Sequence, residues 1–407
     1  MFIKNTLLLS IERISRAGIA FLISFMLTKY YGIDIYGMYA YYIAMLNIIC
    51  VSFSLGLDDY FIKEVAEGKK IPYFFFFIRI LLLFLSFMTM SVFLYLKEPP
   101  DDFFVIVLMT LTYIWNLFYL LLAIENIKNK AWVVFNIILI SAFSFIIKYV
   151  FIEYGILVFI IISFLEGVFL NIYLYLSVKS FFSFTEHKTW FDFYNVLKKS
   201  IPVGLAALSI ILFYRVDQLI IEFYLGNIQL GIYALASSIL LALGYLQSSF
   251  VTSMYGKLGK ANKNDDLLMK ELRFAYSGAI IVGIICCICY LFPGRYLLQK
   301  IIPEHSHNII ELLNIGVFSI FFSGFGAINA QYLFLRGMVG ARLLRTVFAV
   351  IFNVCWNLIL IPFYGTKSAI WGFLITQVFM GVVFNIVDKN TRMLIKCQFY
   401  SIFIWKK

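Results

Sequence analysis

Long apolar runs separated by short polar segments make up almost the whole chain. A helix needs roughly 20 mostly apolar residues to cross a bilayer. We identify twelve such runs, at approximately 6–28, 37–58, 71–96, 103–124, 131–151, 156–178, 201–223, 232–252, 274–292, 309–335, 346–362 and 368–387. They are about twice the length of a membrane-barrel strand and lack its strict inside/outside alternation. The pattern predicts an all-α integral membrane protein with twelve transmembrane helices.

Composition supports this prediction, since 63% of the residues are hydrophobic and 14% are charged. Soluble globular domains are about half apolar and about one quarter charged. The first run carries Glu12, Arg13 and Arg16 and is too long for the core of a cleavable signal peptide, so we expect it to remain as a helix. The six cysteines lie in apolar runs or, for Cys397, near the C-terminus, and they indicate no disulfide framework.

An internal repeat divides the chain into halves. Residues 30–40, YYGIDIYGMYA, return 194 positions later at residues 224–234 as YLGNIQLGIYA, with the shared pattern Tyr-x-Gly-x-x-x-x-Gly-x-Tyr-Ala. Tyr-Gly also follows the fifth and eleventh runs, at Tyr154 and Tyr364. Two unrelated glycine-rich turns are the alternative. Same-sense repeats of six helices are typical of transporters whose substrate site lies between the halves near the bilayer midplane.

The repeat predicts two pseudo-symmetric six-helix bundles, residues 1–178 and 201–387, followed by a cytoplasmic tail at 388–407. Residues 179–200 would form a cytoplasmic linker in which aromatic residues alternate with Lys188, Lys198 and Lys199. An amphipathic helix at the membrane surface and an ordinary linker with aromatic anchors both fit this composition.

The basic residues predict the orientation in the membrane. Of 33 Lys and Arg residues, 23 fall on one side of the twelve runs, 6 fall on the other, and 4 lie inside predicted helices. The count places Arg345 in a loop on the richer side and Lys148 on the poorer side. Because cytoplasmic loops hold the excess of Lys and Arg, we expect both termini in the cytoplasm. The net charge of +11 is mostly this signal and an attraction to anionic membrane lipids, and gives no argument for nucleic acid.

Ionisable residues inside spanning helices are the first place to look for function, because each is costly in a bilayer. Arg13, Arg16 and Glu12 lie roughly 10–15 Å along the first helix, and they can cluster on one face. Arg215 lies roughly 21 Å along the seventh, near its centre. The alternatives are snorkelling of Arg13 to the interface, and a packing pair of Arg215 with a nearby acid, Asp217 or Glu222.

Arginine suits a diphosphate, because its planar guanidinium donates paired hydrogen bonds to phosphate oxygens and stays charged at any depth. We therefore predict that Arg16, Arg215 and Arg13 bind a diphosphate across a central cavity. Asp217 or Glu12 could be protonated in one conformation and paired with arginine in another, which would couple transport to an ion.

Weaker candidates for cavity lining are Arg79, Asn47, Tyr214, Gln218, Asn329 and Gln331. Arg79 can equally snorkel, and amides are also common between packed membrane helices. His305 and His307 lack further metal ligands, and no phosphate-binding glycine loop or nucleophile elbow is present. We expect no metal site, no cofactor and no enzymatic activity.

Several motifs together resemble a known family. They are Tyr31-Gly32-x-x-x-Tyr36-Gly37-x-Tyr39, Ser54-Leu55-Gly56-Leu57-Asp58 with Lys63-Glu64, Arg215-x-Asp217 and Pro362-x-Tyr364-Gly365. Over essentially its whole length, the chain resembles the O-antigen and polysaccharide flippases of the multidrug/oligosaccharidyl-lipid/polysaccharide exporter superfamily.

The resemblance implies a MATE-like, V-shaped pair of six-helix bundles in the bacterial inner membrane. Such a protein moves an undecaprenyl-diphosphate-linked oligosaccharide from the cytoplasmic to the periplasmic leaflet by ion-coupled alternating access. Its partners are then this polyprenyl-diphosphate-linked oligosaccharide and membrane lipids. The resemblance is also compatible with binding to other polysaccharide assembly proteins. Lipid II flippases of the superfamily carry two further C-terminal helices, which disfavours that branch for a chain ending at Lys407.

Two other function classes remain. A drug or cation antiporter of the same fold would favour acidic residues in its lumen. Arg16 and Arg215 therefore count against this function. An O-antigen polymerase or ligase has similar hydropathy, but the short outward loops and the internal repeat count against it.

Overall fold

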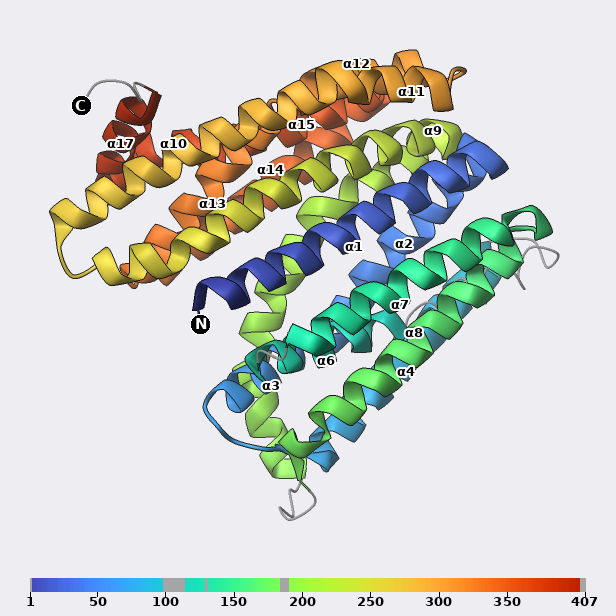
Figure 1. Ribbon diagram of the computed structural model, residues 1–407, viewed down its shortest axis with the longest axis horizontal. Coiled ribbons are helices and arrows are strands. Elements are labelled where there is room, and N and C mark those ends of the chain that lie inside the picture. Colours follow the sequence, from blue (N-terminus) through green and yellow to red (C-terminus); the bar gives the residue numbers. More distant parts are fainter. Residues whose placement is uncertain (1, 98–113, 129–130, 184–189, 403–407) are drawn as a thin grey trace. The chain divides into compact units, whose positions relative to one another are not determined.

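The computed structural model describes the backbone of residues 2–97, 114–128, 131–183 and 190–402 (Figure 1). At several helix ends, residues 2–14 among them, the side chains lie outside the description. Helices account for nearly all of the described residues, as the long apolar runs predict.

Contacts divide the chain into two compact units, one formed by Tyr42–Arg215 and the other by Met1–Tyr41 together with Val216–Lys407. Helices α2 (Ile33–Ser54) and α9 (Trp190–Ala261) contribute to both units. The unit Tyr42–Arg215 also contains α3 (Leu57–Ala66), β1 (Ile71–Pro72), α4 (Tyr73–Lys97), α6 (Ile114–Lys128), α7 (Ala131–Val150), η1 (Ile152–Tyr154), α8 (Ile156–Val178), η2 (Lys179–Phe181) and β2 (Phe182–Ser183). The other unit contains α1 (Phe2–Tyr31), α10 (Asp265–Cys289), η3 (Tyr290–Gly294), α11 (Arg295–Ile301), α12 (Ser306–Gly316), α13 (Ser319–Leu335), α14 (Val339–Tyr364), α15 (Thr366–Val378), η4 (Phe379–Val383), α16 (Phe384–Val387), η5 (Lys389–Thr391) and α17 (Arg392–Ile402).

The described part of the chain holds nine helices long and apolar enough to cross a membrane. One of them, α9, covers two predicted runs, which Gly226 separates by a kink with φ of 78°. Part of the fourth predicted run, 103–113, lies outside the described residues. The remaining runs fall on helices, because a continuous apolar run can satisfy its backbone hydrogen bonds inside a bilayer only in that form.

The boundaries of the two compact units differ from those of the predicted six-helix bundles, and the division into bundles stays a prediction. Residues 1–41 group with the second half of the chain, and residues 201–215 group with the first. Residues 190–200 of the predicted linker belong to α9. Their place at the membrane surface stays a prediction.

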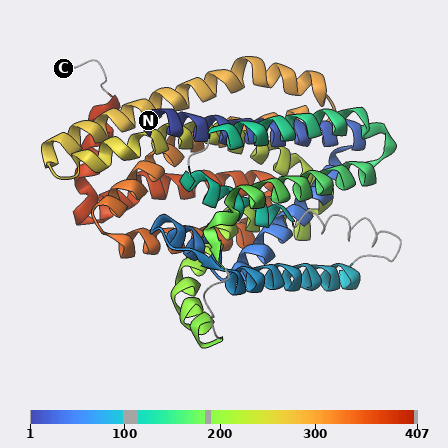
Figure 2. The same cartoon turned by 60° about the horizontal axis from the view of Figure 1, so that its bottom comes forward.

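In the unit Tyr42–Arg215, a hydrophobic core joins α3, α4, α6 and α8. Leu121 of α6 and Leu170 and Leu174 of α8 are almost fully buried in it. A short parallel ladder pairs Ile71 of β1 with Phe182 of β2 and ties the segment before α4 to the segment after α8. Helices α7 and α8 pack along each other, as Figure 2 shows from a second direction.

In the other unit, the segment predicted as a cytoplasmic tail contains an ordered helix. Helix α17 packs on α10, in the upper left of Figure 1. Leu394 and Cys397 of α17 are fully buried against Leu272 and Tyr276 of α10. The tail is therefore anchored, because one face of α17 is apolar enough to join the core.

The two copies of the repeated motif adopt the same backbone form. The first glycine of each copy, Gly32 or Gly226, has a positive φ of 90° or 78°, which a residue with a side chain rarely adopts. The second glycine, Gly37 or Gly231, lies where two backbones meet. The motif therefore marks equivalent structural positions, as expected of an internal repeat.

Candidate functional site

The α9 segment around Arg215 carries several of the predicted site residues. Asp217 and Gln218 are buried, whereas Tyr214 is 38% exposed and Arg215 is half-buried. Adjacent helical positions point in different directions, so the helix turns the acid and the amide into the protein and leaves Tyr214 more open. The segment thus has a packed polar side and a more accessible side that includes Arg215.

Asp217 is held by the second copy of the repeated motif. The Tyr233 hydroxyl, from the Tyr-Ala end of that copy, donates a hydrogen bond to Asp217 Oδ2. The backbone N–H of Gln218 donates to Oδ1 at 2.8 Å. Asp217 and Tyr233 are 5% and 2% exposed. Because each oxygen of the carboxyl group accepts a hydrogen bond, Asp217 can be buried in an apolar interior.

The predicted cationic group on α1 is described only in part. Arg16 is half-buried, whereas the side chains of Glu12 and Arg13 lie outside the described part of the chain. Arg16 and Arg215 belong to different compact units. Diphosphate binding by these residues stays a prediction.

Arg79, which the sequence suggests as a cavity-lining residue, is paired with an acid, and a role in a cavity stays a prediction. Its side chain is 1% exposed and forms a paired ion contact with Asp58, from Nε to Oδ1 at 2.7 Å and from an Nη atom to Oδ2 at 2.9 Å. Asp58 lies in the first turn of α3, after a turn in which Leu55 and Gly56 have positive φ. The arginine therefore reaches an acid of the Ser54–Asp58 motif, instead of snorkelling, and fastens α3 to α4.

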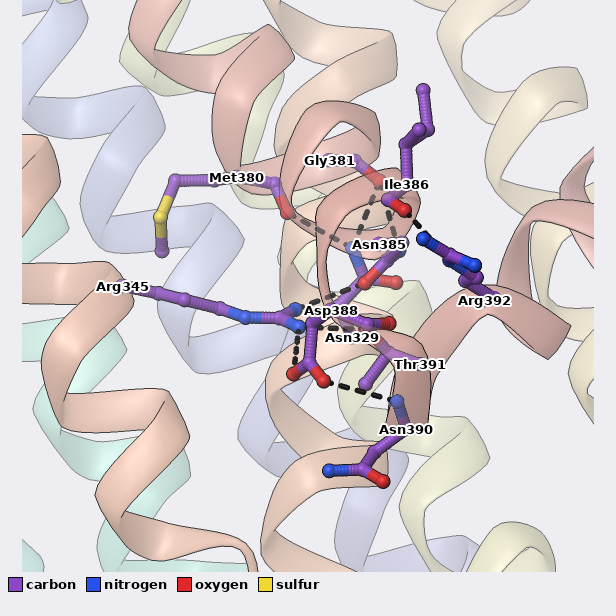
Figure 3. A network of polar contacts seen from close by, with 10 residues as sticks. All are labelled: Asn329, Arg345, Met380, Gly381, Asn385, Ile386, Asp388, Asn390, Thr391 and Arg392. Carbon is purple, nitrogen blue, oxygen red and sulfur yellow. Dashed lines mark hydrogen bonds and ion pairs between the residues drawn. The ribbon is translucent and has the colours of Figure 1, made fainter.

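Asn329, another suggested cavity-lining residue, is 2% exposed and hydrogen-bonded through both ends of its amide, and a role in a cavity stays a prediction. Its Nδ2 donates to the carbonyls of Met380 and Gly381 at 2.9 and 2.8 Å (Figure 3). Its Oδ1 accepts from the Tyr276 hydroxyl at 2.5 Å. These carbonyls belong to the π-helical turn η4, where the regular ladder is interrupted. Asn329 therefore supports an irregular turn.

The other two amides also make backbone contacts. Asn47 Nδ2 donates to the carbonyl of Ile43 one turn earlier at 2.7 Å. Gln331 Nε2 donates to the carbonyl of Val251 on α9 at 3.0 Å. Both are half-buried, so an additional role in a substrate path stays a prediction.

The structure corrects the assignment of Arg345 to a loop. Arg345 lies within α14, is 6% exposed, and donates to Asn385 Oδ1 at 2.9 Å, Asp388 Oδ2 at 3.0 Å and Thr391 Oγ1 at 2.8 Å (Figure 3). Its guanidinium also lies 5.6 Å from the ring centroid of Phe384. The arginine thereby binds the turn between α16 and α17, a contact between residues more than forty positions apart that no local pattern indicates.

Lys148 is a second correction. The basic-residue count assigns it to the poorer side of the membrane, but its side chain is 4% exposed and its Nζ lies 2.6 Å from Glu166 Oε2. Glu166, in the middle of the run 156–178, is an acid that our sequence reading missed. The sequence feature that could have indicated this pair is a carboxylate inside an apolar run together with a lysine near the end of the preceding run.

Among the residues described, no group of three or more His, Cys, Asp or Glu side chains is placed to hold a metal ion. The buried polar groups instead form pairs or small networks within each compact unit.

Comparison with known proteins identifies the fold. No model of a known protein family matches the chain. An uncharacterised membrane protein of Methanocaldococcus jannaschii is 27% identical over 241 residues, or 55% of each chain, so the chain spans about half the length of this relative.

Solved structures match almost the entire chain. Lipid II flippase MurJ in an inward closed conformation superposes with a TM-score of 0.70 at 16% identity, over 98% of this chain and 91% of MurJ. An inward-facing multidrug resistance MATE family transporter of the MOP superfamily gives 0.67 at 11% identity, over 96% of this chain and 94% of that chain. A MOP superfamily transporter from Pyrococcus furiosus, described as having a binding pocket of reversed polarity, gives 0.58 at 12%, over 100% and 97%. The protein is an all-α integral membrane protein with a MATE-like fold.

Proposed function

We propose that this protein is a flippase. It moves a polyprenyl-diphosphate-linked oligosaccharide, such as an O-antigen or other surface-polysaccharide repeat unit, from the cytoplasmic to the outer leaflet of the cytoplasmic membrane. The transport is ion-coupled alternating access, and Arg215 and Arg16 are the cationic contacts for the diphosphate.

The observation that carries this proposal is the half-buried Arg215 in the middle of an apolar helix of a MATE-like fold. An arginine at such a depth is costly, and it is retained in membrane proteins where it meets an anion or a cavity. A diphosphate offers both the charge and the paired oxygens that a guanidinium binds best. Arg16, also half-buried, adds a second cation on α1.

For the Pyrococcus furiosus transporter, the reversed polarity of the binding pocket is described as suggesting a different function, so the fold alone does not determine what is transported. The lipid II flippase MurJ, by its name, acts on a lipid-linked substrate, and it matches this chain over most of both lengths. These likenesses favour a lipid-linked substrate for the present chain and leave the sugar unit open.

A drug or cation antiporter is the second candidate. The buried Asp217 with its Tyr233 partner favours it, because an acid in a lumen can exchange a proton for a cationic substrate. In the flippase proposal the same acid, or Glu12, takes up the coupling ion. The two functions therefore differ at Arg215, which repels a cation and attracts a diphosphate.

Substrate transport by Arg215 variants tests the proposal. In proteoliposomes, Arg215→Ala should slow the initial rate of flipping of a polyprenyl-diphosphate-linked oligosaccharide by about tenfold or more, since hydrogen bonds to charged groups contribute about 1.5–3 kcal/mol. Arg215→Lys should keep part of the rate, because lysine retains the positive charge but lacks the paired N–H donors of the guanidinium. Arg215→Gln should lose nearly all of the rate, because glutamine has no charge. Arg342→Ala, at an exposed arginine of α14, is the matched control and should leave the rate unchanged.

Transport of a cationic dye with no flipping of the lipid-linked oligosaccharide would favour the antiporter. Full flipping by Arg215→Gln would remove the diphosphate role. In cells lacking the protein, lipid-linked oligosaccharide should accumulate on the cytoplasmic face while surface polymer disappears.

A further inference from the structure

A buried ion pair between α7 and α8 is not used in the proposed function. Lys148 Nζ lies 2.6 Å from Glu166 Oε2, and Ser144 Oγ donates to the same oxygen at 2.7 Å. The two charged residues are 4% and 8% exposed. Because α7 and α8 lie side by side in both Figure 1 and Figure 2, the three side chains form a polar bridge between neighbouring membrane helices.

The surroundings of this bridge are apolar. The Lys148 ammonium lies 5.5 Å from the centroid of the Phe159 ring. Helix α8 packs against α6, α7, η1 and η2 and also meets α4, where Phe76 stacks on Tyr175; on α4, Arg79 binds Asp58 and Tyr95 is exposed. Their other described titratable groups are exposed, half-buried or bound elsewhere: Tyr119, Tyr149, Glu153, Tyr154 and Lys179 are exposed, Glu125 binds Ser177, and on α8 itself Tyr173 binds Asn136 and Tyr175 meets Tyr73. Lys148 is therefore the charged group that faces Glu166.

Stability alone is a weak reason for such a pair. Two charges lose their hydration on burial, and well-packed apolar residues of similar size are often as stable. Ionisable residues inside membrane helices commonly form proton or ion pathways. The Lys148–Glu166 pair is electrically neutral at rest, so it can remain in an apolar interior until one partner changes its charge.

The geometry leaves a place for a proton. Both donors bind Oε2 of Glu166, and among the described residues no donor makes a hydrogen bond to Oε1. Side chains on a helix tilt toward its N-terminus, so Glu166 leans toward the turn at residues 151–155 that precedes α8. Lys148 lies two residues before the end of α7 at Val150, beside the same turn. Its long aliphatic stem allows the ammonium to reach the helix end when it is released.

We propose that Glu166 is a proton-binding site in which Lys148 acts as the built-in counter-ion. An incoming proton adds to Oε1 and forms an O–H bond, which converts the carboxylate to a neutral carboxylic acid, and no other covalent bond changes. The Lys148 ammonium keeps its charge, loses its partner and moves toward the turn at 151–155. Loss of the proton restores the ion pair, so proton occupancy changes the contact between α7 and α8.

This inference rests on the proposed function only in that transport is coupled to an ion. It assigns the coupling proton to Glu166, on α8, in addition to the acids Asp217 and Glu12. Its first test uses no transport substrate, so its failure is distinguishable from failure of the flippase proposal.

The direct test is infrared difference spectroscopy of the full-length protein in lipid nanodiscs, between alkaline and acidic buffer. We expect a carboxylic-acid C=O band that is lost in Glu166→Gln and retained in Glu125→Gln, which removes another buried carboxyl. Lys148→Met/Glu166→Gln keeps a neutral, similarly shaped pair and should fold while lacking the same band. An unchanged spectrum in this double variant would overturn the proposal.

A second measurement separates a proton site from a packing contact. With a pH gradient across proteoliposomes and an entrapped pH-sensitive dye, the double variant should lose the proton flux that accompanies transport. The matched control is Lys367→Met/Glu311→Gln, which removes an exposed ion pair of 2.7 Å and should retain full flux. Normal proton flux in the folded double variant would show that the pair is structural.

Discussion

Gly37 and Gly231, the second glycines of the two repeated motifs, meet across a backbone crossing within one compact unit. A Cβ atom at Gly37 would lie 2.9 Å from the backbone nitrogen of Gly231 and would collide with the carbonyl oxygen of Asn227. A Cβ atom at Gly231 would collide with the carbonyl oxygen of Ile33. Asn227 follows Ile33 by the same 194 positions that separate the glycines, so each copy of the motif contacts the equivalent part of the other.

Substitution of either glycine should therefore destabilise the protein. We expect Gly37→Ala or Gly231→Ala to cost about 1–3 kcal/mol, the usual range for overpacking, because the obstructing atoms are backbone. The thermal midpoint of the detergent-solubilised protein measures the effect. Gly244→Ala is the control, since a Cβ atom there meets nothing within 4 Å and alanine favours a helix. Equal midpoints for Gly231→Ala and Gly244→Ala would contradict the close crossing.

The ion pair of Arg79 and Asp58 should be structural. Arg79→Ala leaves a carboxylate without its fixed partner, and we expect a loss of roughly 3 kcal/mol, the lower end for a broken buried pair because Asp58 is 26% exposed. Arg79→Lys should recover only part of this stability, since a single ammonium cannot make both contacts.

Chemical denaturation in detergent provides the measurement, and Arg79→Ala/Asp58→Ala is the matched comparison. The double variant should be less destabilised than the sum of the single variants because both remove one shared interaction. Strict additivity would mean that the two side chains are not coupled.

The hydrogen bond from Tyr233 to Asp217 should contribute more than a bond between neutral groups. Tyr233→Phe should cost about 1.5–3 kcal/mol, whereas Tyr290→Phe, whose hydroxyl binds the amide of Asn314 at 2.8 Å, should cost about 1 kcal/mol. If Asp217 also carries the coupling ion, Tyr233→Phe should alter the pH dependence of transport while Tyr290→Phe leaves it unchanged. Equal losses of stability would argue that Asp217 is not charged in this contact.

The orientation in the membrane follows from the unequal division of basic residues. Reporter fusions at Lys69, Lys263 and Lys389 should report cytoplasm, and fusions at Gly226 and Pro303 should report the opposite side. The same assay at Lys188 and Pro99 extends the test to the predicted linker and the second outward loop, with cytoplasm and outside expected. Reversed signals at any two positions would reject the twelve-helix arrangement.

The sequence alone was sufficient for the membrane class, the helical fold and the repeated motif, because these depend on local properties. A run of about 20 apolar residues can span a bilayer only as a helix. Gly32 and Gly226 occupy the same position in the two copies of the repeated motif, and this repeat can be recognised from the sequence alone. Arg79 and Asn329 were also identified as polar residues inside apolar runs, although their partners were not.

The partners themselves were decided by tertiary packing. Asp58 meets Arg79, Glu166 meets Lys148, and Arg345 meets the turn after α16, over separations of 18 to 46 positions. Helical periodicity shows on which face of its own helix a residue lies, but it does not show which face of another helix packs against that face. A charge buried in an apolar interior needs a partner of opposite charge or a hydrogen-bonding group. The sequence shows which residues need such a partner, but only the packing of the helices decides which residue provides it.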